Sequence, residues 1–249
     1  MMELVVLGAG PAYTDRQGAS GSAYLARARG TDVLLDLGQG SFPRLFREIL
    51  PEDLDAVVIS HLHPDHFIDL VSLRHYLRYQ LRPPRRVRVV APRDLGERLD
   101  ALHAEPGFSA EALDLEELDG REVPIGEVRL LARPVTHTQD SHAFRLASGS
   151  GPGLVYSGDC GRADDLLPLI QPGDTLLSEV SFGPGPVPPG AAHLDGPAVG
   201  RVASAGHAAH VLLTHLQMRL DPDATLAAVR GEFSGDVRFV WPGSRATIG

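Results

Sequence analysis

The residues best suited to chemistry are three histidines and one aspartate that stand within six positions, at His61, His63, Asp65 and His66. They come directly after the apolar run 56–59, which is typical of a strand. On an extended segment residues two apart face the same way, so His61 and His63 can bind one ion together. Asp65 and His66 then fall at the start of the following helix. Imidazole and carboxylate groups suit divalent metals such as zinc, so the pattern predicts a metal site at a strand end.

Six residues cannot complete two metal coordination shells, and three later residues stand where further ligands are expected. His137, Asp159 and His215 each follow an apolar run, at the predicted end of a strand. The carboxyl ends of successive strands in an open α/β sheet converge on one crevice. Gly158 gives the backbone freedom to turn the carboxylate of Asp159 toward a metal. We therefore expect these residues to meet the first cluster in space.

This set of motifs resembles the metallo-β-lactamase superfamily over nearly the whole chain, from Leu4 to Trp241. The resemblance implies an α/β fold, an αββα four-layer sandwich, with a two-metal site at the sheet edge. It implies two divalent metal ions, zinc or manganese, as cofactors. One metal is expected on His61, His63 and His137, and the other on Asp65, His66 and His215, with Asp159 bridging the two.

Two further residues are similar to the phosphodiesterase branch of that superfamily, which contains ribonuclease Z and small cyclic phosphodiesterases. Glu179 lies twenty residues after Asp159 at the end of a predicted strand, and His193 lies 22 residues before His215. In that branch the extra histidine points into the active site and can assist the transition state or the leaving oxygen. The alternatives are a surface histidine for His193 and, for Glu179, a carboxylate that is structural or orients a ligand.

The chemistry expected of such a site is hydrolysis. Two metals about 3.5–4 Å apart lower the pKa of a bridging water toward roughly 7, and the resulting metal-bridging hydroxide can attack phosphorus. Asp65 can accept the water proton, and His193, oriented by Glu179, can protonate the departing alkoxide. These three residues are the expected catalytic residues. We expect a phosphodiesterase that cleaves a small or cyclic phosphodiester, such as a cyclic nucleotide.

Three alternatives remain at this stage: a ribonuclease Z-like RNA 3′-end endonuclease, a carboxylic ester or thioester hydrolase, and a non-catalytic accessory protein on the same fold. Ribonuclease Z carries a long arm for tRNA between the motifs that match His137 and Asp159. Only 21 residues separate them here, and most must form strands around Phe144 and Val155. The net charge of −9 also opposes binding of a long polyanion. A small phosphorylated substrate is therefore the expected partner, with RNA disfavoured.

Two segments have open roles. Residues 74–98, from Arg74 to Arg98, hold eight of the 23 arginines against only two acids. They form either a solvated face or a rim that attracts phosphate. The Pro- and Gly-rich residues 183–190 form either a plain surface loop or a rim that positions His193.

Strands and helices alternate along the 249 residues, and 43% of the residues are hydrophobic, which is typical of a globular α/β protein. We expect a single domain over residues 1–249. The predicted strands are 4–7, 33–37, 56–59, 87–90, 128–131, 154–157, 175–178, 211–214 and 237–241. We predict a helix of about four turns beginning near Asp65, a helix capped by Asp195 and a helix that runs from Asp221 to Gly231.

The remaining features point to the cell interior. The single cysteine, Cys160, cannot form an internal disulfide, and we expect it to be a small buried residue pointing away from the metals. The first residues read as a strand rather than a signal peptide, and no apolar run reaches the length of a membrane helix. We expect a cytoplasmic protein with no membrane partner; a homodimer stays open. Gly8 and Gly10 are expected to let the first loop pass close to the metal crevice.

Overall fold

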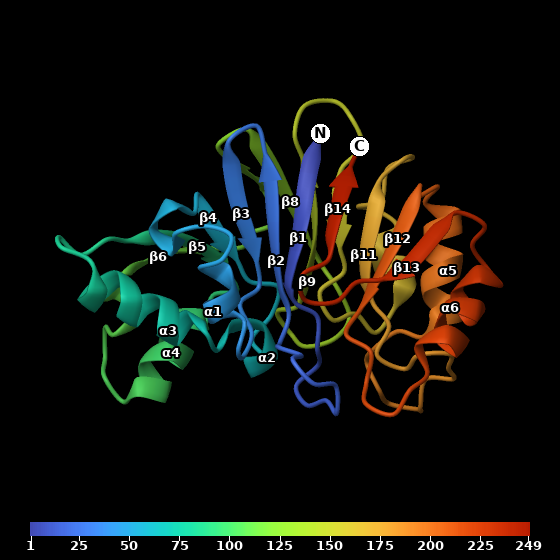
Figure 1. Cartoon of the computed structure of the whole chain (residues 1–249), viewed down its shortest axis with the longest axis horizontal. Helices are drawn as coiled ribbons and strands as arrows, with labels where there is room; N and C mark the ends of the chain where they lie inside the picture. The colour runs from blue at the N-terminus through green and yellow to red at the C-terminus, as the bar shows by residue number, and fades with distance from the viewer.

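Two seven-stranded mixed sheets are stacked face to face in the computed structural model, which describes residues 1–249 (Figure 1). The first sheet consists, in spatial order, of β14 (Arg245–Ile248), β1 (Met2–Gly8), β2 (Ala23–Ala28), β3 (Thr31–Leu35), β4 (Ala56–Val58), β5 (Val87–Ala91) and β6 (Leu113–Glu117). The second consists of β13 (Asp236–Phe239), β12 (His210–Thr214), β11 (Thr175–Glu179), β10 (Leu154–Tyr156), β9 (His142–Ala147), β8 (Val128–Pro134) and β7 (Glu122–Ile125).

Each sheet combines an antiparallel half with a parallel half. Strands β3 to β6 run parallel in the first sheet, and β10 to β13 run parallel in the second. The carboxyl ends of β3, β4, β10, β11 and β12 meet at one edge of the sandwich, the lower edge in Figure 1, and both chain termini lie at the opposite edge. This edge is the place where α/β sheets position their sites.

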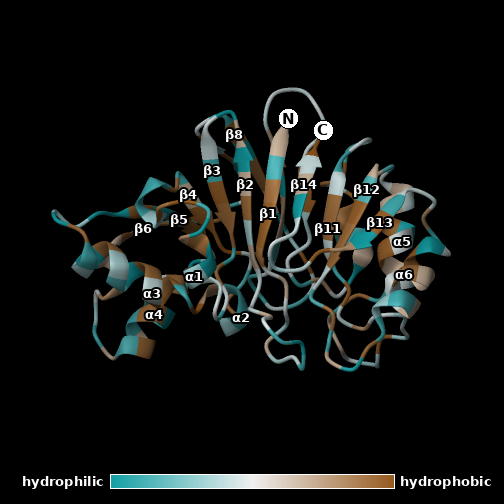
Figure 2. Ribbon diagram, in the orientation of Figure 1, coloured by the Kyte–Doolittle hydropathy of each residue, from teal (hydrophilic) through white to brown (hydrophobic).

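Three apolar layers hold the sandwich together. Leu4, Tyr24, Phe144 and Leu212 belong to the layer between the sheets and are almost fully buried. A second layer packs the first sheet against its helices, and a third packs the second sheet against α5 and α6. Figure 2 shows the hydrophobic colour concentrated on the strands. Since burying one large apolar side chain contributes about 1.5–3 kcal/mol, these layers supply the main stabilisation of the fold.

The helices cover the outer faces of the two sheets, so the predicted four-layer α/β sandwich is confirmed (Figure 1). The helices are α1 (Phe42–Leu45), α2 (Pro64–Phe67), α3 (Leu70–His75), α4 (Leu95–His103), α5 (Gly196–Ala205) and α6 (Pro222–Arg230). Short helical turns lie at Pro51–Asp53, Tyr76–Gln80, Ser109–Glu111 and Ala163–Leu166. None of the helices has both the length and the apolar character that a membrane span requires.

The predicted helix ends at Asp195 and Asp221 are confirmed in detail. Asp195 accepts a hydrogen bond from the backbone N–H of Ala198 at 3.0 Å, and Asp221 accepts one from the N–H of Asp223 at 2.9 Å. Gly231 follows α6 directly. Each aspartate satisfies a backbone donor that the first helical turn leaves without a partner.

The prediction of one continuous helix from Asp65 is wrong, because the structure breaks it into α2, α3 and a π-helical turn. In an unbroken helix the carbonyl groups of Asp65 and His66 would accept hydrogen bonds from residues four positions later. Instead the carbonyl of Asp65 accepts from the N–H of Ser22, and that of His66 accepts from the N–H of Leu37. The ends of two segments in the first sheet therefore take over the helical acceptors.

All nine predicted strands are present, but β2, β6, β7 and β14 were missed, and so were helices α1 and α4. β2 has the sequence AYLARA, whose alanine and leucine content favours a helix locally. β6 and β7 are edge strands in which exposed residues, three of them acidic in β6 and one in β7, interrupt the apolar run. Pairing with neighbouring strands, rather than local preference, makes these segments extended.

The arginine-rich residues 74–98 are largely paired with carboxylates. Arg86, Arg88 and Arg93 lie against Asp114, Glu116 and Glu117 on β6 at 2.5–2.8 Å. Arg74 and Arg78 share a further carboxylate, that of Glu111. Five of the eight arginines are thus neutralised locally, which supports a solvated, ion-paired face over a rim that attracts phosphate.

Asp174 and Arg145 form a buried ion pair that we predict to be important for stability. Arg145 donates two hydrogen bonds to the Asp174 carboxylate, at 2.7 and 2.9 Å, and the N–H groups of Gly153 and Gln171 complete its shell. Asp174→Ala leaves the guanidinium buried without its partner, so it should lower the free energy of unfolding by about 3–5 kcal/mol. Urea unfolding followed by circular dichroism measures this loss.

Asp114→Ala is the matched control, because it removes the carboxylate from the exposed ion pair between Asp114 and Arg86. It should cost less than about 1 kcal/mol. Equal losses for the two variants would contradict the role assigned to burial.

Candidate metal centre

Three imidazole nitrogens converge at the edge where the strands end. His61 Nε2 and His137 Nε2 each lie 3.0 Å from His63 Nδ1. The carboxylate oxygen Oδ2 of Asp159 lies 3.7 Å from His61 Nε2 and 3.6 Å from His137 Nε2. These four residues form one group of potential metal ligands.

A second group lies on the other side of Asp159. His215 Nε2 is 3.3 Å from Asp65 Oδ2, and His66 Nε2 is 3.7 Å from the same oxygen. The other oxygen of Asp159, Oδ1, faces this group, at 3.4 Å from His66 Nε2 and 3.5 Å from His215 Nε2. Asp159 therefore presents one oxygen to each group, which is the arrangement expected of a bridging ligand.

The donor atoms fit divalent metal ions. Around a tetrahedral zinc ion with bonds of about 2.0–2.1 Å, ligand atoms lie about 3.3 Å apart, close to the separations in both groups. His66 Nε2 and Asp159 Oδ1 are buried and have no hydrogen-bond partner within the protein. A buried polar atom without a partner is costly, and a metal ion would remove that cost. The seven expected ligands are thus brought together by the fold.

The imidazoles are oriented by hydrogen bonds on the sides away from the centre. His66 donates its Nδ1–H to Asp36 at 2.7 Å, and His137 donates its Nδ1–H to the carbonyl of Ala192 at 2.8 Å. The hydroxyl of Ser60 donates to Asp36 at 2.8 Å, so it can accept from His61 Nδ1 at 3.1 Å. In each case Nε2 is left free to face the centre. Such outer partners fix the ring orientation and raise ligand basicity.

Two backbone features place the carboxylates. Gly158 has a φ of +54°, and a side chain there would press on the carbonyl of His142, so glycine alone fits this turn before Asp159. Asp36 also adopts a positive φ, of +57°, directly after β3. It is fully buried and accepts hydrogen bonds from Ser60, His66 and the hydroxyl of Tyr156. These contacts compensate for the strained backbone conformation.

His193 and Glu179, the two residues expected to act beside the metals, are in direct contact. His193 donates its Nδ1–H to Glu179 Oε1 at 2.9 Å. The hydroxyl of Ser181 donates to Glu179 Oε2 at 2.5 Å and lies 3.0 Å from His215 Nδ1. Glu179 thus contacts His193 directly and His215 through Ser181. His193 also lies with Asp159 and His215 in a third group of potential ligands, so its role needs a test that measures metal content.

The charges around His193 favour its protonated form. Burial disfavours the imidazolium, but the hydrogen bond and negative charge of Glu179 outweigh burial and raise the pKa of His193 to about 9. Burial opposes ionisation of Asp159, but the imidazoles of His215 and His66 outweigh it and hold its pKa well below the usual range. Burial also opposes ionisation of Asp65, and the hydrogen bond from His215 lowers its pKa nevertheless.

Other residues singled out in the sequence are not part of the ligand groups. The thiol of Cys160 donates to the carbonyl of Arg162, and burial raises its pKa to about 12, so it is not a thiolate at neutral pH. The remaining histidines, His75, His103, His142, His207 and His210, lie outside all three groups. Gly8 packs so tightly against Gly21 that any side chain would overlap its carbonyl. The loop that follows passes close to the centre as expected, because the N–H of His215 donates to the carbonyl of Ala9 and residues 11–13 line the cavity.

The Pro- and Gly-rich residues 183–190 form a loop closed at its base. The N–H of Phe182 donates to the carbonyl of Leu194, and the N–H of Gly196 donates to that of Gly183. His193 lies on the returning segment of this closure, next to Leu194. The two hydrogen bonds tie the segment of His193 to the base of the loop.

A cavity of about 300 Å³ opens above the centre. His63, Asp65, Asp159, His193 and His215 line it, and five further residues form its outer wall. None of the ten lining residues is an arginine. Its volume lies at the lower end of the range for small-molecule sites.

Sequence reasoning missed the residues that orient the ligands. Asp36, Ser60 and Ser181 make the hydrogen bonds that fix three imidazoles, yet none belongs to the histidine-rich motif. Only Asp36 offered a local signal that could have identified it, because it is an acidic residue directly after the apolar strand β3. The carbonyl of Ala192 carries no signal in its side chain at all.

Comparisons with known proteins agree with this geometry. Residues 31–217 match the model of the beta-lactamase superfamily domain. An uncharacterized protein of Mycobacterium leprae is 34% identical, over 91% of this chain and 82% of its own length. The probable metallo-hydrolase YhfI of Bacillus subtilis is 28% identical, over 89% of this chain and 92% of its own.

Two further comparisons concern a solved structure and a longer relative. The crystal structure of YhfI superimposes with a TM-score of 0.87 and covers 99% of this chain and 100% of that one, at 24% identity. A zinc phosphodiesterase of Rattus norvegicus, ELAC protein 2, is 29% identical over 72% of this chain but only 25% of its own length.

Removing one ligand should distinguish two metal positions from one. His66→Ala takes away a ligand of the second group, and we expect about one metal ion fewer per chain, with the fold retained. Asp36→Asn keeps the imidazole but removes the charge that orients it, and should weaken metal affinity about 10–100-fold. Elemental analysis of metal-loaded, dialysed protein measures both effects.

His210→Ala is the matched control, because His210 lies exposed at the far end of the same strand that leads to His215. It should keep the full metal content. A His66→Ala protein that binds as much metal as the parent would contradict the assignment of the second group.

Proposed function

Because this chain belongs to the beta-lactamase superfamily and is a metallo-hydrolase, we propose that it is a phosphodiesterase that cleaves a small or cyclic phosphodiester. The proposal includes two divalent metal ions, one for each ligand group, with zinc as the first candidate. The name of the rat relative, a zinc phosphodiesterase, supports both the metal and the reaction class.

The observation that carries the proposal is the position of His193. Its Nδ1–H is engaged by Glu179, whereas its Nε2 makes no hydrogen bond within the protein, and the ring lines the cavity beside Asp159 and His215. Glu179 raises the pKa of His193 to about 9, which favours the protonated ring and so an N–H that can be donated. A protonated histidine beside a metal centre can supply the proton that a departing alkoxide needs when a P–O bond breaks.

The chain's own residues divide the remaining work. Divalent ions, when bound, neutralise charge on a phosphoryl group and lower the pKa of water. The Asp65 carboxylate lines the cavity in its ionised form and can accept the proton that the attacking water loses. His193 gives a proton to the leaving oxygen, and Glu179 keeps His193 oriented and charged. One proton is thus taken up and one delivered for each bond cleaved.

Three observations favour a small substrate over RNA. A cavity of about 300 Å³ accommodates a small molecule. The segment between His137 and Asp159 holds β9, β10 and their turns, which leaves no protruding arm there. Moreover, most of the arginines at 74–98 are paired with carboxylates and are poorly placed to bind a polyanion.

Phosphorus NMR of the metal-loaded protein with a pool of 2′,3′- and 3′,5′-cyclic nucleotides tests the proposal. We expect conversion to monophosphates that His66→Ala abolishes. The position of the phosphate in the product identifies which ring bond is cleaved. No conversion by protein that holds both metals would contradict the proposal and favour RNA 3′ ends or carboxylic esters, which the same preparation can be offered next.

His193→Ala should separate the proton donor from the metal ligands. We expect the variant to keep its full metal content and to lose about 10²–10⁴-fold in turnover, because the leaving oxygen must then depart without a proton. Steady-state kinetics and elemental analysis of the same preparation measure the two quantities. Loss of a metal ion would instead make His193 a ligand.

A further inference from the structure

An exposed tyrosine stands on the wall of the cavity with no partner in the protein. Tyr13 lines the cavity together with Pro11 and Ala12, and 67% of its surface is exposed. Its hydroxyl makes no hydrogen bond, and its ring contacts no other aromatic ring, whereas the exposed Tyr79 packs against Arg74 and Arg78. A large apolar face left open beside a site is a feature of ligand-binding surfaces.

The loop that carries Tyr13 is held in place by contacts to both sides of the site. Gln39 donates to the carbonyls of Pro11 and Ala12 at 3.4 Å. Arg16 donates to the carbonyls of Leu216, Gln217 and Leu220 at 3.0–3.2 Å, in the segment that follows β12. Tyr13 is therefore positioned by its neighbours, and its exposure does not result from a loop without contacts.

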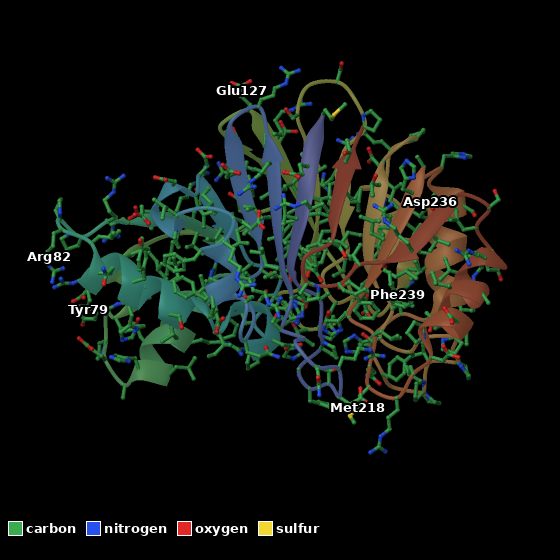
Figure 3. All side chains as sticks on the ribbon, in the orientation of Figure 1. Tyr79, Arg82, Glu127, Met218, Asp236 and Phe239 are labelled. Carbon is green, nitrogen blue, oxygen red and sulfur yellow. The ribbon has the colours of Figure 1, made fainter.

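Gln217 lies on the same wall and offers the complementary chemistry. It lines the cavity two residues after His215, and its side-chain amide makes no hydrogen bond within the protein. Arg16 binds the carbonyl of Gln217 and so links the segment of Gln217 to the loop of Tyr13. An aromatic face and a free amide thus line the same cavity. In Figure 3 the neighbouring residue Met218 marks this edge of the molecule.

From this arrangement we infer that Tyr13 and Gln217 form a nucleobase subsite for the phosphodiester substrate. A base has a flat π face that stacks on tyrosine and an edge of donors and acceptors that an amide can read. The cavity has no arginine for a second phosphate, so the substrate class is a nucleoside with a single phosphodiester group. This inference rests on the proposed function for the reaction, but the subsite itself can be tested by binding alone.

The test compares adenosine 5′-monophosphate with ribose 5-phosphate, which has the same phosphate and sugar but no base. Isothermal titration of the metal-loaded full chain measures both affinities. We expect the parent protein to bind the nucleotide more tightly, and Tyr13→Ala to reduce that preference about tenfold. Tyr13→Phe should keep the preference, because the ring is retained.

Two further variants make the comparison specific. Among the four nucleoside monophosphates, we expect the parent protein to bind one most tightly. Gln217→Ala should lower the affinity for that nucleotide at least about fivefold, without a matching loss of affinity for ribose 5-phosphate. Tyr79→Ala removes an exposed tyrosine at the far end of the molecule, labelled in Figure 3, and should leave the preference as it is in the parent.

Three results would overturn the subsite. The parent protein could bind the two ligands with equal affinity or fail to bind the nucleotide, or Tyr13→Ala could lower the affinity for both ligands alike. Phosphorus NMR reports the reaction separately. A Tyr13-dependent preference without hydrolysis leaves the subsite standing and removes the phosphodiesterase assignment. Hydrolysis without a preference for the nucleotide leaves the phosphodiesterase assignment standing and removes the subsite.

Discussion

The arrangement of the site depends on one buried carboxylate, that of Asp159, which faces a group of imidazoles with each of its oxygens. A carboxylate that is almost fully buried must be compensated by partners, because the charge has lost its hydration. Five histidines and a second carboxylate surround it, and Gly158 supplies the backbone turn that aims it inward. The ligand-bearing strand ends of both sheets must therefore lie close enough to bring their side chains to Asp159.

A second layer of hydrogen bonds extends that constraint into the body of the protein. Asp36 fixes His66 and, through Ser60, His61, while Glu179 fixes His193 and, through Ser181, His215. Each carboxylate therefore controls two imidazoles, one directly and one through a serine. Since Asp36 belongs to the first sheet and Glu179 to the second, each sheet supplies one half of the support.

The surroundings of the site limit what can reach it. The cavity is small and has no arginine, and Glu111 and the acids on β6 pair with five of the eight arginines in residues 74–98. The positive charge in the cavity is thus confined to the histidines and to any ions they hold. This distribution of charge is consistent with the single phosphodiester group that we propose as the substrate.

Much of the site was predictable from the sequence, because strand ends concentrate at one edge and the motif at 61–66 has few other uses. All seven expected ligands come together, and the caps of α5 and α6 follow from local chemistry. Only the tertiary structure decided the rest. The helix after the motif breaks because Ser22 and Leu37 take its carbonyl acceptors, and Arg16 binds the carbonyl of Gln217 across 201 residues. These contacts join distant segments, so no local pattern of residue types encodes them.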